Sequence, residues 1–358
     1  MNLHKIAGKE RREDARKDTG STASICIDNE TLCKITILFQ DTQVFYPKKQ
    51  IFAFFSCTIQ KKVVILQPNC AFIAVMAKKI GVFDSGYGGL TILNEIRKAL
   101  PEYDYIYVGD NARAPYGTRS FDIIYRYTRQ AVEYLISQDC ALIILACNTA
   151  SAKALRTIQQ RDLPPINTKR DENHKVNVLG VIRPTVEAVK EATKTKHVGV
   201  LATPATISSE SYLLEFQKVL PDLVVTQQAC PMWVPLIEAG EHNSEGADYF
   251  VEKYLREILE KDPQIDTLVL GCTHYPLLKE KIDKWLELNT PAHIKTIPQG
   301  NLFANSLTEY LTRHPEYREQ LSTGGSCTYL TTENADRFSQ SASLFLSSPV
   351  QAEHIDLN

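Results

Sequence analysis

Short apolar runs alternate with segments of helical periodicity from residue 79 to the end of the chain. The apolar runs are typical of buried β-strands, whereas Leu90, Leu93, Ile96 and Leu100 recur on one face of a helix. Strands that alternate with helices of this length predict βαβ units and parallel sheets. The predicted strands are 79–83, 104–108, 141–146, 176–181, 197–201, 223–228, 267–270, 294–297 and 326–331. The predicted helices are 88–100, 121–137, 150–160, 183–193, 208–220, 244–261, 275–288, 301–313 and 333–346.

Two features divide this pattern into two similar lobes. The stretch 161–175 is polar, Pro-rich and without periodicity, so we interpret it as the crossing between lobes. The segment 80–85 resembles 198–203 in position and polarity, although any two βαβ units share such a likeness. We predict an α/β fold with mainly parallel sheets flanked by helices. Residues 76–174 plus 295–358 would form the first lobe and 175–294 the second, with a cleft between them.

Composition and charge narrow the class of protein. The 358 residues include 44% hydrophobic and 23% charged residues, which is ordinary for a globular chain, and the net charge of −2 gives no sign of a nucleic-acid surface. The nine cysteines are scattered without a CxxC pair, so reduced thiols in a cytoplasmic protein fit better than disulfides or a zinc ribbon. The chain has no apolar run of membrane-spanning length, so we predict no membrane partner.

Two cysteines occupy matching places in the predicted sheets. Cys147 and Cys272 each follow an apolar strand and precede a helical segment, where a helix N-terminus favours the thiolate. Ligands bind at the carboxyl ends of strands in open α/β sheets. Two acid/base groups in one cleft suit a reaction that removes a proton from one face of a carbon and returns one to the other. The alternative is that each cysteine is a small buried apolar residue.

Polar residues at other strand ends are further candidates. Asp84 and Ser85 open a glycine-rich turn, where they either cap a helix or influence a nearby base and bind substrate. This turn is no dinucleotide fingerprint, because Thr91 occupies the third glycine position. Tyr116 and Gly117 follow a proline in a fixed turn, whose amides could face a carboxylate or serve the turn alone.

The neighbours of the two cysteines complete the set. Asn148 and Thr149 follow Cys147, and Thr273 and His274 follow Cys272. Glu238 is a candidate for the cleft wall, or an exposed glutamate at a helix end. A zinc site from Cys147, Cys272 and His274 is conceivable, but no pair has the usual ligand spacing. A Cys–His hydrolase would leave one of the two matched cysteines without a role.

Four motifs, in this order, resemble those of the glutamate racemase family, within the aspartate/glutamate racemase superfamily. They are Gly81-Val82-Phe83-Asp84-Ser85-Gly86, Pro115-Tyr116-Gly117, Ala146-Cys147-Asn148-Thr149-Ala150 and Leu270-Gly271-Cys272-Thr273-His274-Tyr275-Pro276. The resemblance runs from about residue 79 to the C-terminus. It implies two α/β lobes with the active site between them and a cofactor-independent isomerase that supplies D-glutamate for peptidoglycan. No metal, pyridoxal phosphate or nucleotide would be required.

The resemblance also implies roles for single residues. Cys147 and Cys272 would be the two catalytic bases, acting on D-glutamate and L-glutamate respectively, with Asp84, His274 and Glu238 assisting. Substrate contacts would come from Asp84, Ser85, Tyr116, Gly117, Asn148, Thr149, Thr273 and His274. Glutamate would be the small-molecule partner, and a homodimer is possible. Arg183 stands where many relatives carry an acidic residue, which puts contacts at the inter-lobe edge in question.

Three other activities remain open on the same scaffold. The chain could be a racemase of another acidic amino acid such as aspartate, a Cys-dependent hydrolase or an amino-acid-binding protein. A binding protein would need neither of the two matched cysteines, which argues against that alternative.

The first 75 residues lack the βα alternation, and we expect a poorly ordered extension that is not native. Met76 precedes two lysines and the first strand, so we expect it to be the native initiator. A signal peptide does not fit, because the basic residues near the start are followed by Gly, Ser, Thr and Asp. Mass spectrometry of the native N-terminus checks this expectation, which an intact Met1 would contradict.

Overall fold

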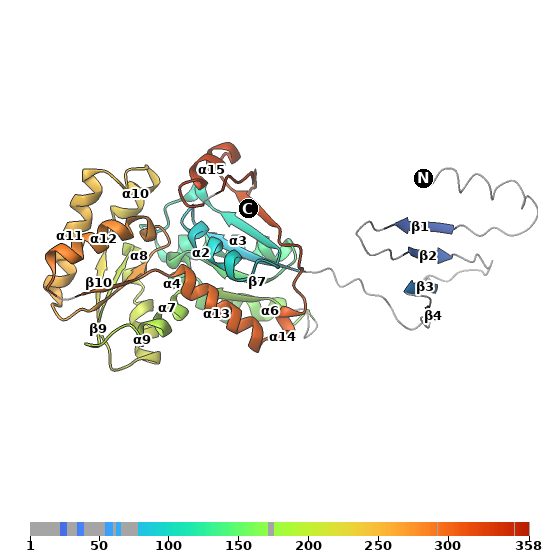
Figure 1. Cartoon of the computed structure of the whole chain (residues 1–358), viewed down its shortest axis with the longest axis horizontal. Helices are drawn as coiled ribbons and strands as arrows, with labels where there is room; N and C mark the ends of the chain where they lie inside the picture. The colour runs from blue at the N-terminus through green and yellow to red at the C-terminus, as the bar shows by residue number, and fades with distance from the viewer. Residues whose placement is uncertain are drawn as a thin grey trace, which may run out of the picture. The chain divides into compact units, whose positions relative to one another are not determined.

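The computed structural model divides the chain into two compact units, Met1–Val75 and Met76–Asn358 (Figure 1). It describes the four strands of the first unit and residues 78–170, 175–291, 293–346 and 348–357 of the second. The four strands β1 (Thr22–Cys26), β2 (Lys34–Leu38), β3 (Phe54–Ile59) and β4 (Lys62–Ile65) pair in that order as an antiparallel sheet. The other residues of 1–75 lie outside the described ones, so a poorly ordered, non-native extension stays a prediction.

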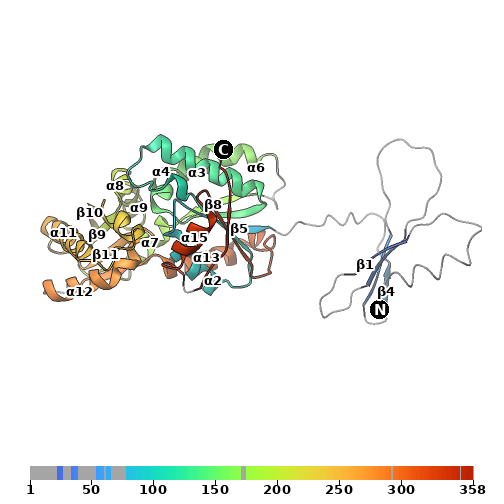
Figure 2. The same cartoon turned by 90° about the horizontal axis from the view of Figure 1, so that it is seen from above.

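Two parallel sheets form the framework of the second unit (Figures 1 and 2). The first sheet has the order β14-β13-β6-β5-β7-β8 and the second β10-β9-β11-β12. The strands of the first sheet are β5 (Lys79–Asp84), β6 (Tyr105–Gly109), β7 (Cys140–Leu145), β8 (Asn177–Gly180), β13 (Cys327–Thr331) and β14 (Ala352–His354). Those of the second are β9 (His197–Ala202), β10 (Val224–Ala229), β11 (Thr267–Gly271) and β12 (Lys295–Ile297).

The same strand order recurs in both sheets. Strand β5 lies between β6 and β7, with β8 next to β7, and strand β9 lies between β10 and β11, with β12 next to β11. The chain therefore winds outward in opposite directions from β5 and from β9, which leaves a crevice at the carboxyl ends of β5/β7 and of β9/β11. The prediction of two similar α/β lobes with parallel sheets is confirmed.

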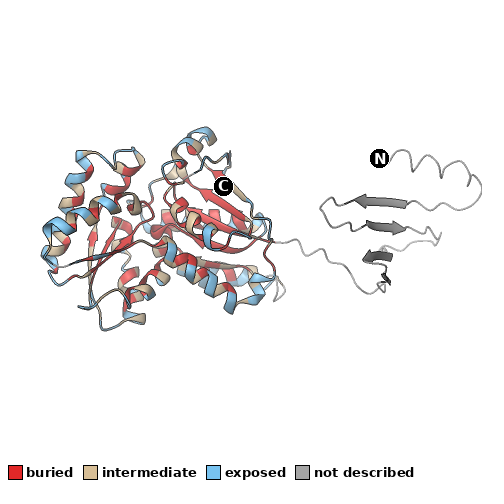
Figure 3. Cartoon of the chain, in the orientation of Figure 1, coloured by how far each residue is buried: buried red, intermediate tan, exposed pale blue. Residues whose placement is uncertain are grey.

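Helices cover both faces of each sheet, and their inward residues form the core (Figure 3). On the first sheet, α2 and α13 pack on one face and α3 on the other; on the second, α7 and α9 pack on one face and α11 and α12 on the other. The helices longer than six residues are α2 (Gly89–Ala99), α3 (Phe121–Ser137), α7 (Ile182–Val189), α9 (Ser211–Val219), α11 (Glu245–Lys261), α12 (Lys279–Asn289), α13 (Gly300–Arg313) and α15 (Ala335–Ala342). The shorter ones are α4 (Asn148–Lys153), α5 (Leu155–Thr157), α6 (Leu163–Asn167), α8 (Pro204–Ser208), α10 (Trp233–Glu238) and α14 (Pro315–Arg318).

Three predicted helices are interrupted. Residues 150–160 are divided between α4, α5 and the π-helical turn Ile158–Asp162, and residues 208–220 between the end of α8 and α9. Residues 275–288 begin as the 3-10 turn Tyr275–Leu278, with Pro276 in its first two positions, before α12 starts at Lys279. Hydrophobic periodicity did not reveal β14, α10, α14 or the 3-10 turn Asn111–Arg113, since these elements are too short to carry a repeating pattern.

In the structure, each crossing between the lobes comes one strand later in the chain than predicted. Strand β8 pairs with β7 of the first sheet, and β12 pairs with β11 of the second. The boundaries at 174/175 and 294/295 are therefore wrong. The Pro-rich stretch is not a crossing, because its prolines occupy the first turn of α6, where a missing N–H costs nothing, and the chain then returns to the first sheet.

Hydrogen bonds around the partly exposed Asp266 hold the amino ends of the second sheet together. The Asp266 carboxylate accepts hydrogen bonds from the Thr193 hydroxyl (2.7 Å) and from the backbone N–H groups of Lys194 (2.6 Å) and Thr195 (2.7 Å). Burial by itself would raise the pKa of Asp266, but these bonds outweigh it and hold the pKa at about 2.

We expect Asp266→Ala to lower the free energy of unfolding by about 1–2 kcal/mol at pH 7, since part of the carboxylate is solvent-screened. A depressed pKa gives stability that is present above the unfolded value near 3.8 and is lost as the pH falls through about 2. The deficit should therefore shrink between pH 4 and pH 2 in urea unfolding experiments. Asp222→Ala is the matched control, because the Asp222 side chain is 84% exposed. A deficit that stays constant down to pH 2 would contradict this account.

Candidate functional site

A cavity lies where the carboxyl ends of strands from both sheets meet. It encloses about 550 Å³ between atoms, counting its open mouth, which suits a small ligand. Its walls come from the loops after β5, β6, β7, β9, β10 and β11. The lining residues are Ser85, Pro115, Tyr116, Gly117, Thr118, Cys147, Asn148, Thr149, Thr203, Pro204, Cys230, Pro231, Val234, Pro235, Glu238, Cys272, Thr273 and His274.

Cys147 lies at the first-lobe side of the cavity, directly after β7. It caps the start of α4, and its Sγ accepts a hydrogen bond from the backbone N–H of Ala150 (3.5 Å) and lies 3.3 Å from Oγ of Ser85. Burial and then the charge of Asp84 raise the pKa of the Cys147 thiol to about 12, against the smaller effect of these two contacts. The sequence suggested that the helix N-terminus favours a thiolate at Cys147. In the structure, burial and the charge of Asp84 outweigh that effect.

Cys272 lies at the second-lobe side, directly after β11, in a different environment. Its Sγ is 3.8 Å from Nδ1 of His274, and Nε2 of the same imidazole is 3.0 Å from Oε1 of Glu238. Burial lowers the pKa of His274, but the contacts with Cys272 and Glu238 outweigh it and raise the pKa to about 10. The raised pKa favours an imidazolium, whose two N–H groups would face the Cys272 sulfur and the Glu238 carboxylate.

Asp84 connects the two lobes from behind the cavity wall. It is fully buried at the end of β5, where its carboxylate accepts hydrogen bonds from the Gly86 N–H (3.0 Å) and the Thr273 hydroxyl (3.4 Å). Burial raises the pKa of Asp84, while the charge of His274 opposes that shift. Gly88 permits this close approach, because a Cβ there would lie 2.3 Å from the Thr273 hydroxyl and 2.5 Å from Nδ1 of His274.

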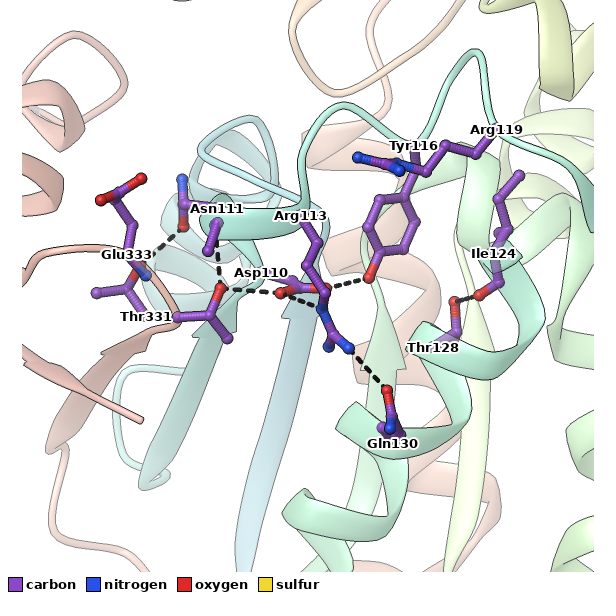
Figure 4. A network of polar contacts seen from close by, with 12 residues as sticks. Asp110, Asn111, Arg113, Tyr116, Arg119, Ile124, Thr128, Gln130, Thr331 and Glu333 are labelled. Carbon is purple, nitrogen blue, oxygen red and sulfur yellow. Dashed lines mark hydrogen bonds and ion pairs between the residues drawn. The ribbon is translucent and has the colours of Figure 1, made fainter. Parts of the chain in front are cut away.

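A second buried carboxylate anchors the loop that carries Tyr116 and Gly117 (Figure 4). Asp110 is fully buried. Its carboxylate accepts a hydrogen bond from the Tyr116 hydroxyl and forms an ion pair with Nε of Arg113 (2.7 Å). Thr332, from the C-terminal part of the first lobe, donates to the same carboxylate (2.8 Å). The Tyr116 hydroxyl is thus bonded to Asp110 inside the protein, and the same carboxylate holds the loop in place at the cavity.

Threonines and amides from both lobes meet beside Cys147. The hydroxyl oxygens of Thr149 and Thr203 are 2.9 Å apart, and the Asn148 side chain exchanges hydrogen bonds with Gln299. Sequence reasoning missed Thr203, Gln299 and the anchoring role of Asp110. The likeness of 198–203 to 80–85 was a signal for Thr203, which stands at the position that Ser85 has in the first lobe.

Every predicted site residue lies at this cavity. Ten of the predicted side chains or backbones line it, and Asp84 lies directly behind. The roles assigned to them stay predictions. Arg183 lies elsewhere, exposed on α7, where it pairs with Glu187 (3.0 Å) and Glu215 (3.5 Å). It therefore serves salt bridges on the surface and takes no part in the cavity.

No group of three His, Cys, Asp or Glu residues in the described part of the chain is arranged to hold a metal ion, the set of Cys147, Cys272 and His274 included. None of the helices described for this chain is long and apolar enough to cross a membrane.

Comparisons with known proteins point to one family. The profile of the Asp/Glu/hydantoin racemase family matches residues 88–296. A glutamate racemase from Ruegeria sp. (strain TM1040) is 40% identical over 277 residues, which cover 75% of this chain and 96% of that protein. The motif resemblance is thereby confirmed.

Solved structures agree with this assignment. A glutamate racemase isoform from Bacillus anthracis has 31% identity and a TM-score of 0.67, covering 78% of this chain and 98% of that one. The glutamate racemase from Francisella tularensis subsp. tularensis SCHU S4, solved in complex with D-glutamate, has 33% identity and a TM-score of 0.67, covering 79% and 98%.

We expect Glu238→Gln to lower the pKa of His274 from about 10 towards its ordinary value, because the carboxylate that favours the imidazolium is removed. A pH titration of the imidazole by NMR measures this shift. Glu241→Gln is the control, since Glu241 is exposed in the same segment and makes no contact with the ring. An unchanged titration in Glu238→Gln would show that the carboxylate does not tune His274.

Proposed function

Because the chain belongs to the Asp/Glu/hydantoin racemase family, we propose that it interconverts L- and D-glutamate with Cys147 and Cys272 as the two acid/base groups. The observation that carries this proposal is the placement of the two thiols. Each follows the corresponding strand of its own lobe, β7 or β11, and both line one small cavity. A carbon held between them can lose a proton on one face and gain one on the other.

The reaction needs two proton transfers and no change of oxidation state. One thiolate removes the α-proton, forming an S–H bond, while the electron pair of the broken C–H bond spreads into the α-carboxylate. The opposite thiol then gives its proton to the other face of the α-carbon and becomes the thiolate. Hydrogen-bond donors around the carboxylate stabilise the negative charge of the intermediate. The reverse reaction exchanges the two roles.

The electrostatic difference between the two thiols supports a direction for each. Cys272 lies 3.8 Å from Nδ1 of His274, whose pKa is raised, whereas burial and Asp84 raise the pKa of Cys147 to about 12. A cation beside Cys272 and a protonated Cys147 suit a reaction in which Cys272 deprotonates L-glutamate and Cys147 protonates the intermediate. It agrees with the roles that the motif resemblance implies.

Neutral donors would hold the two carboxylates of the substrate. Among the described residues, none that lines the cavity is Lys or Arg. Donors at the cavity include the side chains of Ser85, Asn148 and Thr149 and the backbone of the Tyr116–Gly117 turn. Such donors stabilise negative charge strongly when they are fixed and shielded from water. The buried contacts of this wall provide both conditions.

The three alternative activities predict different products. A racemase for aspartate would turn over L-aspartate faster than L-glutamate. A Cys-dependent hydrolase would form a thioester on one cysteine, detected by mass spectrometry as an adduct. An amino-acid-binding protein would bind D-glutamate without exchanging its α-proton for deuterium. Racemisation of L-glutamate in D₂O, monitored with and without a chelator, separates these possibilities.

The biological setting follows from the proposed reaction. We propose that the protein acts in the cytoplasm, where reduced thiols persist, and supplies D-glutamate for peptidoglycan. The five cysteines of the described residues 78–357 are free, which fits that compartment. A homodimer, as the motif resemblance implies, is part of the same proposal, and sedimentation of the full chain measures it.

We expect Cys147→Ala and Cys272→Ala each to lower the racemisation rate of glutamate by at least about 10³-fold, because each removes the only base on one face. Circular dichroism monitors the conversion of each enantiomer, and proton NMR in D₂O monitors the exchange of the α-proton for deuterium. Cys140→Ala is the matched control, since Cys140 is equally buried but lies at the amino end of β7. Near-normal racemisation by either single variant would refute the two-base scheme.

A further inference from the structure

A buried polar cluster lies beside Cys147, where segments of both lobes meet. It consists of Asn148, Thr185, Tyr212 and Gln299, each at most 2% exposed. Gln299 follows β12 and precedes α13, so it sits on the crossing from the second sheet to the helix that packs on the first. Thr185 lies on α7, just after the other crossing, and its hydroxyl donates to the carbonyl of Val181 (2.7 Å).

The hydrogen bonds of this cluster determine which way the Gln299 amide points. The Thr185 hydroxyl proton is used on Val181, and the Tyr212 hydroxyl donates to Oδ1 of Asn148 (2.8 Å). Both hydroxyl oxygens therefore have only lone pairs left for Gln299, and its Nε2 lies 2.8 Å from the first and 2.9 Å from the second. The nitrogen of Gln299 must face them, which leaves its Oε1 for Asn148.

The orientation of Gln299 in turn determines that of Asn148. Oε1 of Gln299 accepts a hydrogen bond from Nδ2 of Asn148, and Nε2 of Gln299 lies 3.1 Å from Oδ1 of Asn148. Since Tyr212 also donates to this oxygen, Oδ1 is directed into the cluster. Asn148 lines the cavity next to Cys147, and the group it has left to offer there is its second N–H.

We infer that Gln299 is a positioning residue that holds Asn148 with an N–H, and not its oxygen, towards the substrate carboxylate. A flipped Asn148 would turn lone pairs towards a negative charge. The inference rests on the proposed substrate-binding role of Asn148. Gln299, which lies outside the four motifs, would thus keep the Asn148 N–H directed into the cavity beside Cys147.

Gln299→Leu tests the inference, because leucine has a similar volume and can neither donate to nor accept from Asn148. We expect kcat/KM for L-glutamate to fall by about 10- to 100-fold, mainly through KM, the cost of one misdirected hydrogen bond to a charged group. Gln320→Leu is the matched control. Gln320 is also buried, but its side-chain N–H donates to the backbone carbonyl of Glu316. Its own backbone carbonyl accepts from the N–H of Lys78 at the amino end of the first sheet.

A double-mutant cycle with Asn148→Ala separates positioning from general stability. If Gln299 acts through Asn148, Gln299→Leu should lower kcat/KM by less than about 2-fold once Asn148 is alanine. Equal losses in both backgrounds, or full activity of folded Gln299→Leu, would overturn the inference. Full activity of Asn148→Ala would overturn the proposed role of Asn148 as well.

Gln299→Glu keeps the shape of the side chain and serves where Gln299→Leu does not fold. Its carboxylate can still accept from Nδ2 of Asn148, but it cannot donate to Oδ1 and it draws the Tyr212 hydroxyl proton away, so Oδ1 loses both of its donors and no longer holds the amide in place. The same loss, confined to the background that retains Asn148, is expected. If neither variant folds, as judged by thermal unfolding, Gln299 is a structural residue and the inference is overturned.

Discussion

The structure around the cavity depends on one constraint: buried polar groups of each lobe have their partners in the other. Asp84 accepts from Thr273, Thr149 meets Thr203, and Asn148 bonds to Gln299. A buried polar atom without a partner costs about 1–3 kcal/mol, so the lobes close in the register that satisfies all these pairs. The same register places the two cysteines at a single cavity.

The symmetry of the framework does not extend to its electrostatics. The strand order repeats, and each thiol follows the corresponding strand of its lobe. Around Cys147, however, the nearest charge is the Asp84 carboxylate, whereas Cys272 faces an imidazolium that Glu238 supports. The two equivalent thiols thus lie in different electrostatic surroundings, which suits a reaction that alternates base and acid.

The two crossings between the lobes contribute to the site as well as to the chain path. Strand β8 leads into α7 and β12 leads to α13, and both junctions end at the cluster beside Asn148. A change in the angle between the lobes would act on these hydrogen bonds. The geometry of the wall next to Cys147 is therefore linked to the closure of the molecule.

The sequence by itself determined most strands and helices, the two-lobe plan and the polar strand-end residues at the cavity, because periodicity and strand-end motifs are local signals. It placed Cys147, Cys272, Ser85 and His274 correctly at the carboxyl ends of strands. Only the tertiary structure decided which sheet β8 and β12 join, the raised pKa of Cys147 and the partners Gln299, Thr203 and Asp110. Edge pairing, desolvation and hydrogen bonds between distant segments depend on positions in space that no single stretch of sequence encodes.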